Sequence, residues 1–462
     1  MSLDLLTGRK KPAASATPLW CTDRDHWAQG ALPLTPAQRR WAQATGFDAS
    51  PHSHALLPGD DGAVAAVLVG VRSPDDPFVL SSLPRALPPG TYVLGAEGLA
   101  LDDQAVALSW LLGSYRFDLY RRSSREPARL QLRASASASR GAVMGEAICA
   151  VRDLVNTPAE HMGPAELAEA VQMLAKAHGA RFQQTVGEAL LMQNFPAIHA
   201  VGRAATRAPR LIELQWGDPD HPLVSLVGKG VCFDSGGLDI KGADGMRWMK
   251  KDMGGAANVI GLATMIMALK LPVHLQVLIP AVENAIAGNA YRPGDVYKTR
   301  AGIHIEIGNT DAEGRVILCD ALAYAVEGNP ELIIDMATLT GAARVALGPQ
   351  LPALFTRNTP LARELMDHGH ALQDPVWQLP LWGPYHGLIE SDIADIVNTG
   401  KGPMAGAVTA ALFLADFVPE QQEWLHLDCF AWNDGNRPGR PVGGEAQGIR
   451  TLLAMLEQRY GG

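Results

Sequence analysis

A chain of 462 residues is longer than a single hydrophobic core usually supports, so its length predicts two domains. Its 47% hydrophobic and 19% charged residues are typical of a globular protein, and its formal net charge of -9 argues against a nucleic-acid-binding surface. Five widely spaced cysteines argue against a disulfide framework, and the lack of an apolar run of membrane length or a signal-like start predicts a cytoplasmic protein without membrane contact.

The first part of the chain, residues 1–135, is expected to form a small α/β domain. Residues 62–71 and 90–95 have the apolar composition of buried strands, and the pattern of residues 101–121 predicts a helix long enough to cover a sheet. The small, polar and basic residues at 123–141 are typical of a linker.

The remainder, residues 136–462, is expected to form a larger catalytic domain. Helical patterns at 141–158 and 165–179 precede strand patterns at 181–186 and 211–216. This alternation predicts a mostly parallel mixed sheet flanked by helices, so the fold class of both domains is α/β.

Two segments place charged side chains beside glycines and strand ends, where such side chains have no role in packing. The first, residues 222–261, contains a strand, glycine-rich turns and the start of a helix, and the second, residues 303–328, contains a strand, a turn and an amphipathic helix. Because charges at the carboxyl ends of buried strands mark binding crevices in α/β sheets, we expect both turns to meet in one pocket. The charged residues that stand beside these glycines and strand ends include Lys229, Asp234, Lys241, Asp252, Asp311, Glu313 and Arg315.

Four carboxylates in one pocket would repel one another, and divalent cations would remove that repulsion. Oxygen ligands from Asp and Glu suit Mg²⁺, Mn²⁺ or Zn²⁺, and two such ions would balance the four negative charges. A lysine in this cluster can ligate only as the neutral amine, whereas an arginine keeps its proton and is suited to hold an anion.

Simpler explanations exist for each residue taken alone. Any one aspartate in a glycine-rich turn can cap the turn or a helix, and Cys232 and Cys319 are better explained as buried thiols than as ligands. His161 is better explained as a loop or capping residue, and the glycines around Lys229 lack the spacing of a phosphate-binding loop. The joint occurrence of two charged turns favours a metal site.

Five stretches of the larger domain resemble the leucyl aminopeptidase family, the cytosol aminopeptidases that hold two metal ions. They are residues 227–237, 238–241, 245–257, 293–322 and 335–342. The resemblance implies two divalent ions per subunit, Mn²⁺ or Zn²⁺, or Mg²⁺ in one site, and two bridging ligands, Asp234 and Glu313. The full implied ligand set is Lys229, Asp234, Asp252, Asp311 and Glu313, and the implied catalytic residues are Lys241 and Arg315.

The resemblance also assigns residues that contact the substrate. Residues 331–342 predict a strand that runs into a turn of small residues, which lets a ligand approach the backbone. By resemblance, the carbonyl of Leu339 binds the substrate, and Met249, Thr338 and Gly341 line an apolar pocket for its first side chain. Without the resemblance, Met249 would be assigned to the core.

The implied reaction is hydrolysis of the amino-terminal residue from peptides with a free amino terminus. A water that bridges the two ions becomes a nucleophile near neutral pH, and Lys241 donates to the developing oxyanion. By resemblance, Arg315 positions a bicarbonate base, and the protein forms a homohexamer. A nucleic-acid-binding protein and a catalytically silent relative remain alternatives, although the acidic composition disfavours the first and the presence of Lys241 and Arg315 disfavours the second.

Overall fold

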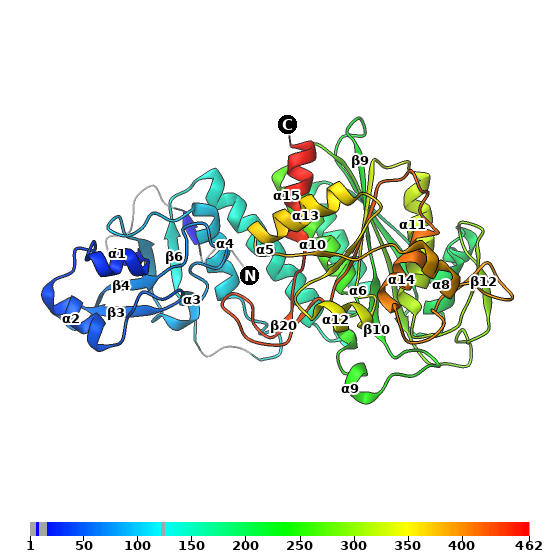
Figure 1. Cartoon of the computed structure of the whole chain (residues 1–462), viewed down its shortest axis with the longest axis horizontal. Helices are drawn as coiled ribbons and strands as arrows, with labels where there is room; N and C mark the ends of the chain where they lie inside the picture. The colour runs from blue at the N-terminus through cyan, green and yellow to red at the C-terminus, as the bar shows by residue number, and fades with distance from the viewer. Residues whose placement is uncertain (1–5, 9–15, 122–124, 462) are drawn as a thin grey trace. The chain divides into compact units, whose positions relative to one another are not determined.

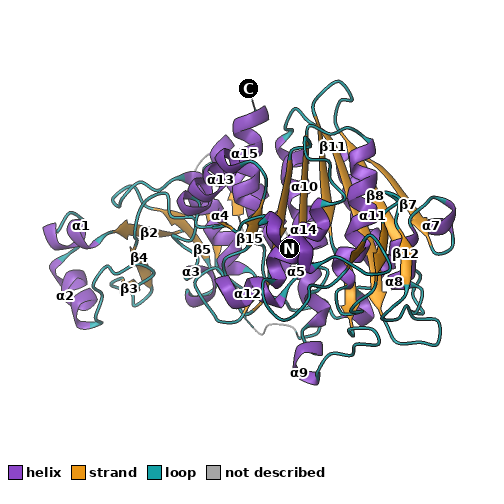
Figure 2. Ribbon diagram, turned by 45° about the vertical axis from the view of Figure 1, so that its right-hand side comes forward, coloured by secondary structure: helices purple, strands orange, loops and turns teal. Residues whose placement is uncertain are grey.

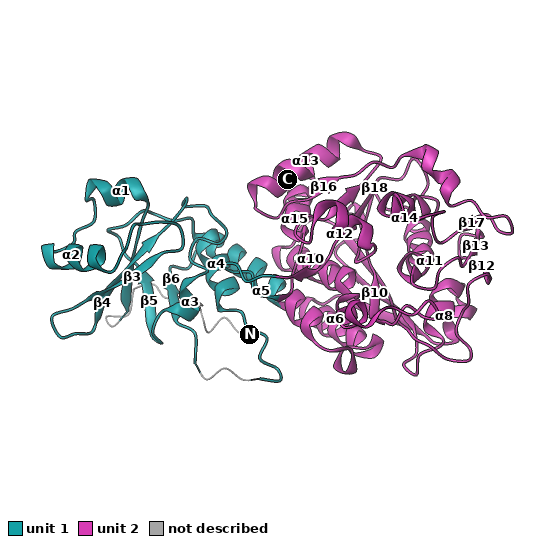
Figure 3. Ribbon diagram, turned by 60° about the horizontal axis from the view of Figure 1, so that its bottom comes forward, with its two compact units in different colours: residues 1–149, 435–442 teal, residues 150–434, 443–462 magenta. Residues whose placement is uncertain are grey.

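The computed structural model describes residues 6–8, 16–121 and 125–461 (Figures 1 and 2). The chain divides into two compact units, drawn in different colours in Figure 3. Unit 1 comprises Met1–Cys149 and Gly435–Val442, and unit 2 comprises Ala150–Asp434 and Gly443–Gly462. The domain limit expected between residues 135 and 136 stays a prediction, and most of the start of the chain, where no secretory signal was expected, lies outside the described residues.

The described residues of unit 1 form a six-stranded sheet in the order β1-β6-β5-β2-β4-β3. Its strands are β1 (Leu6–Gly8), β2 (Thr17–Thr22), β3 (His54–Pro58), β4 (Val64–Gly70), β5 (Thr91–Leu94) and β6 (Arg129–Leu132). Its helices are α1 (Arg24–Gln29), α2 (Pro36–Ala44), α3 (Leu83–Ala86) and α4 (Asp103–Ser114). Fully buried residues such as Leu19, Val67 and Trp110 join this sheet to α4 in one core.

Two predictions for this part of the chain need correction. The helix predicted over residues 101–121 forms, but it ends at Ser114 because Tyr115 leaves the helical conformation and is buried. The predicted linker is wrong, because it contains β6, which pairs with β5 and β1, and the start of α5 (Ala136–Asn156). Leu130 and Leu132 are both buried. Their alternation, which is typical of a strand, was not recognised because basic and small residues surround them.

Among the described residues, unit 2 is built on a nine-stranded sheet whose central strands are parallel. The order is β16-β15-β18-β14-β9-β11-β8-β7, and β10 pairs with β11. The central pairs of β18, β14, β9 and β11 are parallel, whereas β8 pairs antiparallel with both β11 and β7. The predicted mostly parallel mixed sheet is confirmed. Its strands are β7 (Arg181–Val186), β8 (Arg210–Trp216), β9 (Leu223–Gly228), β10 (Gly230–Asp234), β11 (His274–Asn284), β14 (Leu332–Ala337), β15 (Ala353–Phe355), β16 (Trp377–Gln378) and β18 (Trp424–Asp428).

Helices cover both faces of this sheet (Figure 1). One face carries α6 (Pro164–His178), α10 (Gly254–Leu269) and α15 (Ile449–Tyr460), and the other carries α8 (Pro196–Gly202), α11 (Glu313–Glu327) and α14 (Gly406–Ala415). The remaining elements of unit 2 are η2 (Ala159–His161), α7 (Ala189–Met192), α9 (Ala243–Met246), η3 (Met249–Lys251), β12 (Val296–Lys298), β13 (His304–Glu306), α12 (Gly341–Leu347), α13 (Thr359–Ala371), η4 (Gly383–Leu388), β17 (Ile396–Val397), β19 (Trp432–Asn433) and β20 (Gly443–Gly444).

The segment Met249–Leu269, which comprises η3 and α10, is long and apolar enough to cross a membrane by length and composition. This corrects the expectation that no apolar run reaches that length. However, 83% of its apolar window is buried inside the protein, because α10 packs between the sheet and α15. A core helix explains the same composition. All five cysteines are buried, and the prediction that Cys232 and Cys319 are buried thiols is confirmed.

The carboxyl ends of the parallel strands lie at one edge of the sheet. Lys229 follows β9, Thr338 follows β14, and three polar residues, Asp234, Asn284 and Asp428, are the last residues of β10, β11 and β18. This is the edge at which α/β sheets bind ligands, because the backbone leaves the sheet there and frees the side chains that follow.

Candidate metal centre

Lys229 joins β9 to β10 at this edge. Its backbone N–H donates to the carbonyl of Met336 on β14 at 3.0 Å, which fixes the start of the side chain. Its ammonium nitrogen donates to the carbonyl of Thr338 at 2.8 Å and lies 2.8 Å from Asp252 Oδ2 and 2.9 Å from Glu313 Oε1. The side chain is 3% exposed, so these oxygens replace its water shell.

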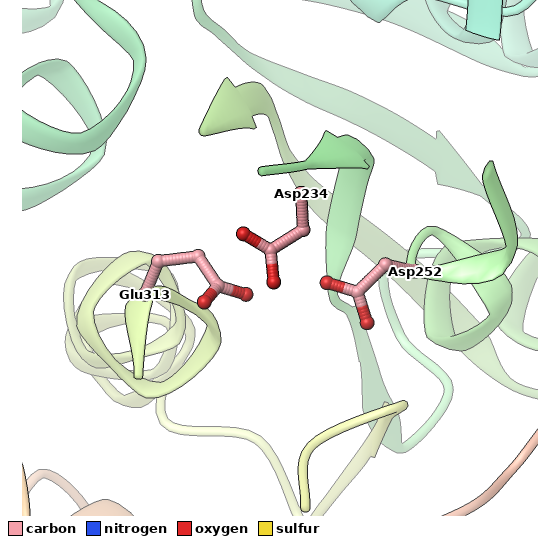
Figure 4. A group of neighbouring side chains, drawn as sticks. All are labelled: Asp234, Asp252 and Glu313. Carbon is pink, nitrogen blue, oxygen red and sulfur yellow. The ribbon is translucent and has the colours of Figure 1, made fainter. Parts of the chain in front are cut away.

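Three carboxylates face one another beside this lysine (Figure 4). Asp234 ends β10, Asp252 directly follows η3, and Glu313 is the first residue of α11. One oxygen from each carboxylate lies within 4.8 Å of the other two, and all three residues are buried. Three separate elements therefore bring negative charge to one point.

Asp311 and Lys241 lie on the more exposed side of these carboxylates. The ammonium nitrogen of Lys241 is 2.8 Å from Asp234 Oδ2 and also contacts Asp311 Oδ1. The turn that returns the chain to Lys241 requires glycine at position 236, where φ is +88° and a Cβ atom would lie 2.5 Å from the carbonyl oxygen of Asp239. The four predicted carboxylates and both predicted lysines thus form one cluster, which we call the carboxylate cluster.

Gly314, in the second turn, leaves space for the side chain of Lys229 in the first turn. A Cβ atom at Gly314 would lie 2.6 Å from Cε of Lys229, so only glycine lets the lysine pass against the first turn of α11. The glycine between Glu313 and Arg315 is therefore explained by packing against Lys229.

Burial and mutual repulsion shift the pKa values of the cluster. Burial, followed by the charge of Asp234, raises the pKa of Asp311 to about 6 and the pKa of Glu313 well above its usual range. Burial alone would lower the pKa of Lys229 and of Lys241, but the carboxylates around them raise both pKa values. Four carboxylates and two ammonium groups leave an excess of negative charge, which disfavours full ionisation of the carboxylates.

Arg315 lies beside the cluster on α11. It is 8% exposed, and burial lowers its pKa to about 10. Its Nε–H has no hydrogen-bond partner within the described structure. A buried guanidinium group with an unpaired donor is suited to bind an anion.

Comparison with known proteins decides the family. A model of the catalytic domain of the cytosol aminopeptidase family matches residues 149–453, and a model of the M17 aminopeptidase N-terminal domain matches residues 17–133. The chain belongs to the cytosol aminopeptidase family. A probable cytosol aminopeptidase of Syntrophotalea carbinolica is 42% identical over 373 residues, which cover 77% of this chain and 75% of the relative.

Solved structures of similar proteins share the fold. The crystal structure of the cytosol aminopeptidase of Coxiella burnetii is 48% identical and matches with a TM-score of 0.94, covering 99% of this chain and 100% of that one. The bottromycin maturation enzyme BotP in complex with Mn is 33% identical, with a TM-score of 0.87 that covers 96% of this chain and 100% of BotP. The family and the α/β fold with a smaller amino-terminal domain, both predicted from the sequence, are confirmed.

As a cytosol aminopeptidase, the protein is a metallo-aminopeptidase, a hydrolase that removes amino-terminal residues from peptides in a metal-dependent reaction. The cluster has the chemistry to hold divalent metal. Asp252 Oδ2, Asp311 Oδ1 and Glu313 Oε1 are buried without a hydrogen-bond partner, although an ammonium nitrogen lies at ion-pair distance from each. Buried carboxylate oxygens with free lone pairs fit a divalent cation.

The residues expected to bind substrate in this aminopeptidase lie around the end of β14. Thr338 Oγ1 donates to Asp252 Oδ1 at 2.8 Å, and the backbone N–H of Leu339 donates to Asp428 Oδ1 at 2.9 Å. Met249 begins η3 and Gly341 begins α12. Every predicted site residue except Arg315 lines one cavity of about 300 Å³.

Two polar residues of this aminopeptidase site, Asn284 and Asp428, were not predicted from the sequence. The side-chain amide of Asn284 donates to Asp234 Oδ1 at 2.8 Å and to the carbonyl of Thr310 at 3.0 Å, so it links the two turns. Asp428 accepts the N–H groups of Leu339 and Thr340 and fixes the loop after β14. Each of them is the polar last residue of an apolar strand. The same pattern identified Asp234 in the sequence and could have identified Asn284 and Asp428.

Proposed function

We propose that this aminopeptidase hydrolyses the first peptide bond through a water that bridges two divalent ions, with Asp234 and Glu313 as the bridging ligands. The proposed ligands are Lys229, Asp234, Asp252, Asp311 and Glu313. Divalent ions would lower the pKa of a coordinated water and polarise the scissile carbonyl. The observation that carries the proposal is the convergence of four carboxylates and Lys229 at the carboxyl ends of parallel strands.

The ions are proposed to be Mn²⁺ or Zn²⁺, or Mg²⁺ in one site, and the Mn complex of the related BotP supports manganese. Lys229 would ligate as the neutral amine, which nearby divalent cations favour because they disfavour its positive charge. Thr338 holds Asp252 in place through their 2.8 Å hydrogen bond. The carbonyl of Leu339 binds the substrate backbone, and Met249, Thr338 and Gly341 border the first side chain.

Lys241 is proposed to stabilise the oxyanion that develops as the carbonyl is attacked. Its side chain lines the cavity and remains 16% exposed, so a substrate can reach its ammonium group. Arg315 is proposed to position a bicarbonate that supplies the base, and its unpaired Nε–H supports an anion beside it.

The substrates are proposed to be peptides with a free amino terminus, acted on in the cytoplasm by a homohexamer. The bound ions would hold the free α-amine, which limits cleavage to the first bond. A native mass measurement of the purified protein would show six copies of the chain if the assembly is correct, and a monomer or dimer would contradict it.

The central test is metal removal and return. A chelator should abolish the hydrolysis of leucine-containing dipeptides, and Mn²⁺ or Zn²⁺ should restore it together with two bound ions per subunit by elemental analysis. Hydrolysis that survives complete metal removal would contradict the mechanism. For the bicarbonate, Arg315→Ala should slow turnover, and turnover of the unmodified protein should rise with added bicarbonate; the same rate in its complete absence would refute that role.

A further inference from the structure

The cavity that holds the carboxylate cluster is also lined by two basic residues and an aromatic ring outside the cluster. Lys251 at the end of η3, Arg344 in α12 and Phe430 in the segment after β18 all line it. The ammonium nitrogen of Lys251 lies 4.5 Å from the centroid of the Phe430 ring, and the guanidinium carbon of Arg344 lies 4.8 Å from the same centroid. We call these three residues the basic pocket.

Lys251 is a buried cation without an acidic partner. It is 6% exposed, and among the described residues no carboxylate lies within ion-pair distance of its ammonium group. The neighbouring acids are engaged elsewhere, since Asp252 contacts Lys229 and Thr338, and Asp428 accepts hydrogen bonds from the loop after β14. An ammonium group so deeply buried is costly unless a negative group completes its surroundings, and a single aromatic ring offsets only part of that cost.

Its sequence neighbour Lys250 shows the contrast. The ammonium nitrogen of Lys250 donates to the carbonyl of Asn156 at 2.6 Å, and Lys250 does not line the cavity. One of two adjacent lysines therefore has an oxygen partner in the fold, and the other lines a cavity that a ligand can enter.

Arg344 adds a second cation to the same space. Its side chain is exposed, and no ion pair to it occurs within the described part of the chain. A guanidinium group that stacks on an aromatic ring keeps its fork of N–H donors free, and that fork matches a carboxylate.

We propose that the basic pocket binds a carboxylate in the first side chain of the substrate, so that this enzyme prefers peptides that begin with Asp or Glu. The inference rests on the proposed function, because it requires the first side chain to lie beside Met249, Thr338 and Gly341, which line the same cavity. Met249 and the Phe430 ring provide apolar walls for the methylene groups, and the two cations meet the acidic end. This preference differs from the apolar one that the family resemblance implies.

The first test compares matched dipeptides on the Mn²⁺-loaded, unmodified protein. Peptides that begin with Glu, Gln or Leu and share their second residue should differ in kcat/KM, with Glu favoured over Gln by about tenfold or more, since the two differ in charge and not in size. Equal kcat/KM values for the Glu and Gln peptides would overturn the inference. Cleavage of the leucine peptide in the same experiment would show that the proposed function still holds.

Substitutions then identify the residues responsible. Lys251→Met should lower kcat/KM for the Glu peptide about tenfold more than kcat/KM for the Leu peptide, and Arg344→Met, which changes an exposed side chain, should act in the same direction. Lys250→Met removes the same charge one residue away and should leave the ratio of Glu to Gln unchanged. An unchanged ratio in both pocket variants, or an equal fall in the Lys250 variant, would overturn the assignment.

A binding measurement separates recognition from turnover. Calorimetric titration of the Mn²⁺-loaded protein should show tighter binding of free L-glutamate than of L-glutamine, and Lys251→Met or Arg344→Met should remove the difference. Equal binding of the two amino acids would overturn the inference. If no peptide of any kind is hydrolysed and neither amino acid binds, both this inference and the proposed function fail.

Discussion

The carboxylate cluster and the basic pocket share one cavity but differ in how their buried charges are compensated. In the cluster, Lys229 lies between Asp252 and Glu313, both within 2.9 Å. In the basic pocket, Lys251 is buried almost as deeply, and its ammonium nitrogen lies 4.5 Å from the centroid of the Phe430 ring. The same residue type therefore serves two purposes: surrounded by carboxylates it belongs to a cation site, and without them it forms part of an anion site.

The largest effect is expected when one carboxylate is removed from the cluster, because this tests whether the cluster binds cations. We expect Asp252→Asn to lower kcat/KM at least about a thousandfold and to reduce the number of bound ions, because Lys229 loses a partner and the ions lose a ligand. Hydrolysis rates and elemental analysis would measure both effects. Asp244→Asn, which changes an exposed carboxylate on α9, is the matched control. Full activity with full metal content would contradict the ligand role.

Removing a lysine from the cluster tests whether its charge acts on the substrate or on the fold. Lys241→Ala should lower kcat about a hundredfold and leave metal content unchanged, because Lys241 is assigned to the oxyanion. Turnover and metal content should be compared with Lys298→Ala, an exposed lysine of β12. Unimpaired turnover would remove the role assigned to Lys241.

The amide that links the two turns should affect metal affinity more than catalysis. Asn284→Ala should weaken Mn²⁺ binding about tenfold to a hundredfold, because Asp234 loses the 2.8 Å hydrogen bond that orients it. Titration of the metal-free variant with Mn²⁺ would give the affinity. The exposed Asn289 provides a control, as Asn289→Ala should bind Mn²⁺ with the affinity of the unmodified protein. An unchanged affinity in the Asn284 variant would show that Asp234 is oriented by other contacts.

The smallest expected effect concerns the packing that holds Lys229 in place. Gly314→Ala should destabilise the protein by about 1–3 kcal/mol, because its Cβ atom would overlap the lysine side chain. Denaturant unfolding would measure this loss. Gly387→Ala adds a methyl group where no atom lies within 4 Å and should change the free energy of unfolding little. Equal stability of the two variants would mean that Lys229 can move aside at little cost.

Much of the fold could be predicted because its signals are local. Strands β4, β5, β8 and β14 follow from segments rich in apolar residues, and α6 begins at Pro164 and ends before Gly179 as its sequence indicates. β6 could not be recognised, since its buried leucines lie among basic and small residues that also suit a linker. The second predicted turn does follow a strand, but this strand, β13, belongs to a small separate sheet with β12 and β17, because pairing partners are set by tertiary contacts.

The sequence alone determined which charges stand at strand ends and glycine turns, and hence that a cation site of this family was to be expected. Only the tertiary structure decided which buried charges have partners. Next to Asp252 in the sequence, Lys251 looks like half of an ion pair, but adjacent residues in a helical turn do not face each other. Three separate elements are needed to place Lys251, Arg344 and Phe430 around one space, and a contact among side chains from distant parts of the chain exists only once the chain has folded.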